Sequence, residues 1–241
     1  MFAIYKREMR SYFTTPIGYV FIAVFLAASG FSFALTTLQV QSSDVSLYFQ
    51  ILMFAYIVIL PLLTMKTFAE ERRTRTEQLL LTAPVSLPGM VLAKFFAAFT
   101  MFLGTLLTSA LYFYPMSLYG DVNWARAWGS LIAMILIGMT FISIGIFVSS
   151  LTENQFTASF GTIGILLILM IVAMLNNIID SYAVRLVLDW LSIYSRYMNF
   201  TYGIFDFGAV VYYTSLASCS CFCLSASSRK DVGRDGEGSV T

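Results

Sequence analysis

The most informative absence in this 241-residue sequence is histidine, which does not occur at all. Histidine is the side chain that proteins use most often as a general base, as a metal ligand and as a pH switch near neutrality. Hydrolytic triads and histidine-based metal sites are therefore excluded. The sequence also has no Lys directly after a Gly, so the phosphate-binding pattern G-x-x-x-x-G-K-[ST] is missing. We expect neither ATP hydrolysis nor a bound cofactor in this chain.

Charged residues are also scarce. They make up 11% of the sequence, whereas soluble domains carry roughly 25%. Hydrophobic residues make up 59%, and the mean hydropathy is +0.80. This composition predicts an integral membrane protein. The net charge of +1 offers no basic face to nucleic acid, so we expect a lipid membrane and no nucleic acid as a partner.

Cysteine is limited to Cys219, Cys221 and Cys223, which lie within five residues of one another. A disulfide framework needs cysteines from separated segments, so this cluster indicates nothing about an oxidising compartment. Cys219 and Cys223 can share a helix face and could bind a soft metal, but without further cysteine or histidine the ligand set is incomplete. We therefore expect no metal site.

Long intervals without charge are the clearest positive signal. A membrane-spanning helix needs about 20 residues free of uncompensated charge, and the gaps between charged residues allow six such helices. We therefore predict an all-α integral membrane protein with six transmembrane helices. An even number of spans places both termini on one side of the membrane. The predicted spans are 17–38, 46–66, 92–116, 128–150, 156–176 and 207–226.

The distribution of Lys and Arg predicts which side that is. Only Arg126, Arg185 and Arg196 fall on the side opposite the termini. Because basic residues concentrate in cytoplasmic loops, both termini are predicted to be cytoplasmic, in a plasma or inner membrane. The basic residues on the side of the termini are Lys6, Arg7, Arg10, Lys66, Arg72, Arg73, Arg75, Lys94, Arg229, Lys230 and Arg234.

Residues 1–14 show the pattern of an amphipathic helix, which we expect in the cytoplasmic headgroup layer. A frayed basic tail is the alternative. A cleaved signal peptide is disfavoured because the apolar run that follows is too long and five further spans come after it. The apolar face holds Phe2, Tyr5, Met9 and Tyr12, and the basic face holds Lys6, Arg7 and Arg10.

The predicted spans carry no charge near their middle, which argues against proton-driven transport but leaves a passive pore open. Small residues punctuate the fourth and fifth spans instead. Close helix approach in lipid depends on such residues, either within one bundle or at a subunit interface. They are Gly138, Ser143, Gly145, Ser149, Ala158, Gly161 and Gly164.

Residues 177–206, predicted to be external, are too apolar for a solvated loop. Arg185 and Asp189 can pair at i,i+4. We therefore predict short re-entrant helices in the outer leaflet, with Trp190, Tyr194 and Tyr197 at headgroup level. The region is either an aromatic membrane anchor or a gate, for which Arg185, Asp189 and Trp190 are the candidate residues.

Residues 67–86, between the second and third spans, form the most charged stretch. A helix over 67–83 is predicted, with Glu71 and Arg75 in the favourable i,i+4 orientation. Pro84 ends it, because proline disfavours helix at the preceding residue. A charged start and an apolar end suit a cytoplasmic docking surface, and a solvated connector is the alternative.

Three stretches together resemble the ABC-2 type permeases, the membrane subunits of ABC transporters. They are EERRTRTEQLLLTAPVSLPGMVLAKF (70–95), YKREMRSYFTTPIGYVF (5–21) and SSLTENQ (149–155). SRYMNFTYGIFDFGAVVYYTSLA (195–217) is also similar to the entry of the last span in the subgroup that contains gliding-motility-associated permeases. The resemblance covers roughly 1–217. The tail at 227–241 is atypical, because relatives finish on a short basic tail.

The resemblance implies that residues 1–241 form one ABC-2 type transmembrane domain in which 67–86 is a coupling helix that docks on a cytoplasmic ABC ATPase subunit. Arg75 stands where relatives usually carry Gly. The implied docking residues are Glu70, Glu71, Arg72, Arg73, Thr76, Glu77, Leu79, Leu80 and Leu81, with Thr152, Glu153 and Asn154 as a smaller second contact.

The implied working unit is two six-helix halves, as a homodimer or with a paralogue, and two ATPase subunits that hold ATP and magnesium. ATP-driven closure would switch the halves between access states, and export is the expected direction. Two other functions remain open. One is a non-transporting scaffold or assembly component of a surface machine, and the other is a passive channel.

Overall fold

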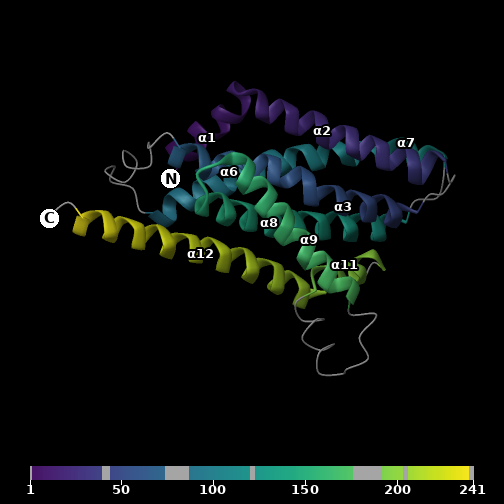
Figure 1. Cartoon of the computed structure of the whole chain (residues 1–241). Helices are drawn as coiled ribbons and strands as arrows, with labels where there is room; N and C mark the ends of the chain where they lie inside the picture. Colours follow the sequence, from purple (N-terminus) through teal and green to yellow (C-terminus); the bar gives the residue numbers. More distant parts are fainter. Residues whose placement is uncertain are drawn as a thin grey trace.

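The computed structural model describes residues 2–39, 44–73, 87–119, 123–175, 192–202 and 206–238. Every regular element in these ranges is helical, and none is a strand. Figure 1 shows the helices in one elongated bundle. They are α1 (Phe2–Thr14), α2 (Pro16–Phe33) with the π-helical turn η1 (Ala34–Leu38), α3 (Val45–Thr64), α4 (Lys66–Arg73), α6 (Leu87–Ser109), the 3₁₀ turn η2 (Ala110–Tyr112), α7 (Phe113–Tyr119), α8 (Trp124–Leu151), α9 (Gln155–Leu175), α11 (Ile193–Thr201) and α12 (Phe207–Gly238).

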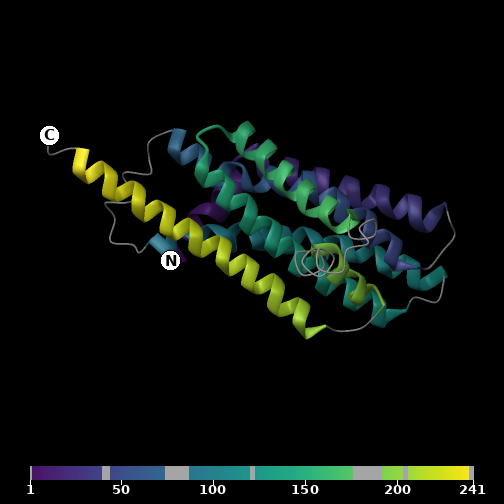
Figure 2. The ribbon, with the colours of Figure 1, turned by 60° about the horizontal axis from the view of Figure 1, so that its bottom comes forward.

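Five helical segments in the described ranges are long and apolar enough to cross a membrane. Each of the six predicted intervals contains a helix, but the last is shorter in its apolar part, Phe207–Cys223. Its helix α12 continues to Gly238, beyond the predicted end of the span at 226, and projects past the bundle (Figures 1 and 2). The five segments are Pro16–Leu38, Val45–Glu70, Pro88–Ser117, Trp124–Leu151 and Gln155–Val172.

Polar residues set where several helices begin. Pro16 occupies the first turn of α2, after the extended residue Thr15, and so separates α2 from α1. Asp44 accepts a hydrogen bond from the Ser46 backbone N–H at 3.0 Å at the start of α3. Asn123 accepts one from the Arg126 N–H at 3.3 Å at the start of α8. Such capping satisfies N–H groups that have no partner inside their own helix.

Helix α8 lies at the centre of the bundle, where it contacts α3, α4, α6, α9, α11 and α12. The close approach of its neighbours depends on Gly138, because a Cβ there would be 2.3 Å from the ring of Phe102 on α6. That ring also packs edge-on against Tyr56 of α3, with 5.3 Å between the ring centroids. The small residue at 138 therefore serves packing within this chain.

The two ends of the bundle differ in the elements that they carry. Helices α1 and α4, the start of α6 and the turn between α8 and α9 lie at one end, and α7 and α11 lie at the other (Figure 1). The first described helix and the C-terminal end of α12 share the α4 end. The described termini therefore lie at the same end of the molecule.

The region 177–206, predicted to be external, is described only in part. Arg185, Asp189 and Trp190 lie outside the described residues. Helix α11 falls inside the predicted region, and its Tyr194 hydroxyl accepts a hydrogen bond from Gln50 of α3 at 2.5 Å. Tyr197, predicted at headgroup level, is 1% exposed and packs in the protein core, so its ring contacts protein, and its depth in the membrane stays a prediction. Periodicity alone did not distinguish lipid from protein as the surroundings of this ring.

Candidate functional site

The start of α4 is a polar junction at which side chains of two other helices bind backbone groups. Only Met65 separates α3 from α4. The Ser149 hydroxyl of α8 donates to the Met65 carbonyl at 3.2 Å and accepts from the backbone N–H groups of Phe68 and Ala69, each at 3.2 Å. Ser149 is fully buried. One side chain of α8 thus holds three backbone groups of the α3–α4 junction.

Lys94 of α6 holds the same junction. Its ammonium donates to the Thr67 carbonyl at 2.5 Å and lies 4.4 Å from the centroid of the Phe68 ring. The residue is 1% exposed, and a buried charge is tolerated only when it is paired and hydrogen-bonded. The Glu8 carboxylate of α1, 3.9 Å from the Lys94 nitrogen, supplies part of that pairing.

Helix α1 contributes a further contact through Tyr12. The Tyr12 hydroxyl donates to the Leu63 carbonyl at 3.5 Å, near the end of α3. Burial raises the pKa of Tyr12 above its ordinary value, so the phenol stays neutral and remains a donor. Four helices, α1, α3, α6 and α8, therefore meet around the first turn of α4.

The predicted α1 helix is present, and its basic and aromatic residues separate as the sequence pattern indicates. Lys6, Arg7 and Arg10 are exposed, and Arg7 forms an ion pair with Glu8 at 2.8 Å. The Tyr5 hydroxyl donates to Thr100 of α6 at 3.2 Å. Helix α1 is thus held against α6 on one face and presents its basic residues on the other.

The predicted docking residues that the structure describes lie in two segments at the same end of the bundle (Figure 1). Glu70 on α4 pairs with Lys66 at 3.2 Å. Helix α4 contacts both α8 and α9, and the turn between these helices carries Thr152, Glu153 and Asn154. Glu71, Arg72 and Arg73 belong to the α4 backbone helix, whereas Thr76, Glu77, Leu79, Leu80 and Leu81 lie outside the described residues, as does most of the helix predicted over 67–83.

The three residues of the turn between α8 and α9 differ in their exposure to the surroundings of the protein. Glu153 and Asn154 are exposed and Thr152 is half-buried. The Asn154 side chain accepts a hydrogen bond from the Phe156 N–H at 3.1 Å, which caps α9. The exposed carboxylate of Glu153 is therefore the group of this turn that is best placed to meet another protein.

Sequence reasoning missed two residues of the junction. Lys94 was counted toward topology and lies in the family-like stretch 70–95, and Ser149 was counted as a small packing residue and begins the stretch 149–155, but neither was assigned a role at this junction. The available signal for Lys94 was its position as the one charged residue in the otherwise apolar segment Pro88–Ser117. Nothing in the sequence distinguished Ser149 from Ser150, whose hydroxyl bonds only to Phe147 of its own helix, at 2.6 Å.

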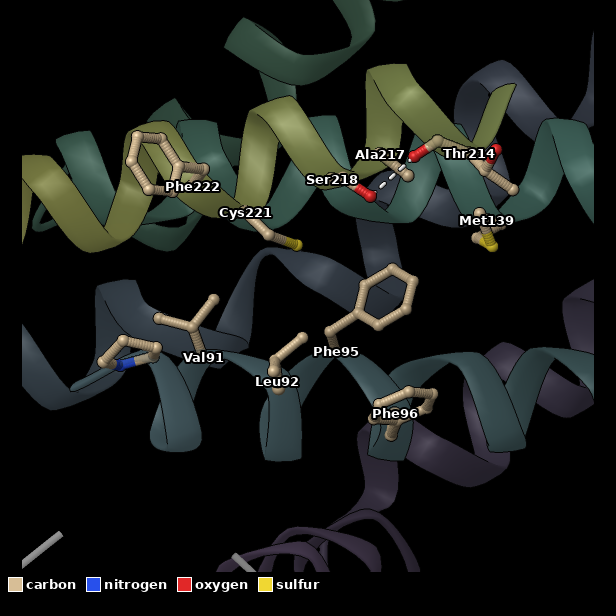
Figure 3. A pocket seen from close by; sticks show the side chains of 11 residues that line it. Val91, Leu92, Phe95, Phe96, Met139, Thr214, Ala217, Ser218, Cys221 and Phe222 are labelled. Atoms are coloured by element: carbon tan, nitrogen blue, oxygen red, sulfur yellow. Dashed lines mark hydrogen bonds between the residues drawn. The ribbon is translucent and has the colours of Figure 1, made fainter. Parts of the chain in front are cut away.

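A groove of about 630 Å³ lies between α6 and α12, next to Met139 of α8 (Figure 3). Its two hydroxyl groups are already satisfied inside α12, because Thr214 donates to Val210 at 2.8 Å and Ser218 donates to Thr214 at 2.8 Å. The remaining lining is mainly apolar. The groove therefore offers hydrocarbon contact rather than a polar binding site. In the described ranges, no three Cys, Asp or Glu residues gather as a metal site would need.

The apolar helices and the polar junction at one end define a multi-pass membrane protein whose second and third spans are joined by a charged segment. The chain matches the family model described as ABC-2 family transporter protein over residues 2–218. It therefore belongs to the ABC-2 family, and it is a membrane-spanning permease subunit of an ABC transporter, a class that works with a partner ATP-binding subunit. No curated protein and no solved structure matches the chain.

Proposed function

We propose that the chain is one six-span half of an ATP-driven exporter, with both termini in the cytoplasm of a plasma or inner membrane. The apolar part of α12, Phe207–Cys223, would be the sixth span. Two facts support an even number of crossings: the described termini share one end of the bundle (Figure 1), and that end carries most of the Lys and Arg residues.

The ATPase partner docks at the end of the bundle that carries α4. The observation that supports this most is the contact of α4 with α8 and α9, which brings the two charged segments implied by the family resemblance to one place. Glu70 to Arg73, Thr76, Glu77 and Leu79 to Leu81 form the main contact, and Thr152 to Asn154 form the smaller one. ATP and magnesium are held by the partner subunit.

Transport proceeds by rigid-body movement. Closure of two ATPase subunits on ATP pushes the charged segments of two permease halves and rocks those halves against each other, a known kind of switching transition. The second half is an identical copy or a paralogue. The described parts of the spans lack a charged residue near their middle, which fits an uncharged path between the halves.

Docking is tested by co-expressing the chain with the ATPase subunit encoded beside it and purifying through a tag on the chain. Retention of the ATPase and its ATP turnover are measured for the natural chain and for Glu71→Arg with Glu77→Arg. We expect the reversal to abolish retention. The matched control reverses two tail carboxylates, Asp231→Arg with Asp235→Arg, and is expected to retain the ATPase.

Two results would favour the other functions. If the ATPase never binds, or binds equally to all three proteins, residues 67–86 are a topology signal and the chain is a scaffold or assembly component. If the purified chain conducts ions or solutes across a bilayer without any ATPase, it is a passive channel.

A further inference from the structure

The first turn of α4 is held by a side chain of a third helix. Helix α3 ends at Thr64 and α4 begins at Lys66, so the regular helix is interrupted only at Met65. The Ser149 hydroxyl of α8 lies 3.2 Å from the Met65 carbonyl and 3.2 Å from the Ala69 N–H, two groups four residues apart that face each other in an α-helix. These hydrogen bonds attach the first turn of α4 directly to α8.

A second contact to the start of α4 comes from α6. The Thr67 carbonyl accepts from the Lys94 ammonium at 2.5 Å, and the ammonium also lies over the Phe68 ring. Hydrogen bonds from a charged donor are roughly twice as strong as neutral ones, and a desolvated cation–π contact adds to them. Within three residues, α4 is thus attached to α8 by Ser149 and to α6 by Lys94.

We propose that Ser149 and Lys94 are positioning residues that transmit movement of α4 to α8 and α6. The inference rests on the proposed docking of an ATPase on α4. Without these contacts α4 loses its hydrogen bonds to Ser149 and Lys94, and it can move while α6 and α8 stay in place. Their role is to keep α4 and the two spans moving as one body when the partner pushes on α4.

The test uses the full complex of chain and ATPase in lipid nanodiscs and measures two quantities separately. The first is the affinity of the ATPase subunit for the permease. The second is the change in backbone hydrogen–deuterium exchange that ATP with orthovanadate produces in α4 and in the halves of α6 and α8 that adjoin it. Docking and transmission are thereby read out independently.

Ser149→Ala removes the hydroxyl, and Lys94→Met removes the charge at similar length. For both variants we expect unchanged ATPase affinity and a retained response in α4. We expect the response in α6 and α8 to fall by about twofold to thirtyfold, the range for residues that modulate coupling by 0.5–2 kcal/mol. Ser150→Ala is the matched serine control and Lys6→Met the matched lysine control, since no hydrogen bond among the described residues joins either of them to α4. Both controls should behave as the natural chain.

Each result decides something. If Ser149→Ala and Lys94→Met transmit the response as fully as their controls, the inference is overturned while docking stands. If the natural chain does not bind the ATPase, the proposed function fails and the inference with it. If both variants yield no folded protein, the two residues serve stability alone, which also overturns the inference. The inference is supported if either variant binds the ATPase with unchanged affinity but shows a reduced hydrogen-exchange response in α6 and α8.

Discussion

Thr64 on α3 and Gly145 on α8 touch without space for another atom: a Cβ at position 145 would lie 2.2 Å from the Thr64 hydroxyl oxygen. This contact is one turn of α8 before Ser149, so it fixes how closely α3 approaches α8 near Met65, the residue between α3 and α4. In lipid, close approach through small residues replaces the hydrophobic drive that brings helices together in water.

Gly145→Ala is expected to destabilise the bundle by about 1–3 kcal/mol, the usual cost of overpacking a well-filled interior. The oxygen that the new methyl meets is on a short, buried side chain that cannot swing away. Gly164→Ala on α9 is the matched control, because no described atom lies within 4 Å of a Cβ placed there. Thermal unfolding in detergent measures both. Equal midpoints for the two variants would contradict the prediction, and adding Thr64→Ala to Gly145→Ala should restore part of the loss.

The hydrogen bond between Gln50 and Tyr194 predicts how firmly α11 is attached to α3. Tyr194→Phe deletes the acceptor and should weaken the attachment by about 0.5–1.5 kcal/mol, the net contribution of an ordinary hydrogen bond. Tyr202→Phe is the control, since Tyr202 is 69% exposed. Hydrogen exchange of the α11 backbone should quicken in the first variant only. Unchanged exchange in Tyr194→Phe would show that packing alone holds α11.

Asp206 predicts a pH effect at the start of α12. Its carboxylate accepts from the Asn199 amide at 3.1 Å and from the Gly208 N–H at 2.9 Å. These bonds, the Asn199 bond first, lower the pKa of Asp206 below its ordinary value of 3.8. A lowered folded pKa means that the stabilisation is fully present above the ordinary value. It is lost as the pH falls through the folded pKa.

Two substitutions separate the charge of Asp206 from its capping role. Asp206→Ala removes the cap and should cost about 0.5–2 kcal/mol near neutral pH, whereas Asp206→Asn keeps a good capping side chain and should cost less. Neither variant should show the loss of stability at acidic pH that Asp206 contributes in the natural chain. Unfolding midpoints measured between pH 7 and about pH 3, which brackets the ordinary carboxyl pKa, test this. An identical acid response in all three proteins would contradict it.

The natural cysteines of α12 report on the proposed sixth span. Cys219 and Cys223 are exposed in this chain, and Cys221 is half-buried at the groove between α6 and α12. In inside-out vesicles we expect a membrane-impermeant maleimide to reach Cys223 first and Cys221 last. In right-side-out vesicles it should label none of them, whereas a Tyr202→Cys control should be labelled there. The reversed pattern would place the termini outside.

The amino-acid sequence by itself determined the membrane class and the intervals in which apolar helices lie. Spacing between charges indicated those intervals, which hold five long apolar helices and the shorter apolar part of α12, because uncompensated charge is costly in hydrocarbon wherever it occurs along the chain. The motifs at 5–21, 70–95 and 149–155 indicated the family that the match over residues 2–218 shows. Pro16 and Asn123, which the sequence analysis did not single out, set helix starts through local chemistry. All of these signals depend on a residue and its near neighbours in sequence.

Only the tertiary structure decided what Lys94, Ser149 and Tyr197 do. Ser149 and Ser150 are the same residue type in adjacent positions, but the Ser149 hydroxyl bonds to the Met65 carbonyl and to two N–H groups of α4, whereas the Ser150 hydroxyl bonds to its own helix. Gly145 is required against Thr64, and Gly164 is not. These differences arise because the rotation and depth of each helix are set by the helices packed against it. Such contacts join residues far apart in the chain, and no local pattern encodes them.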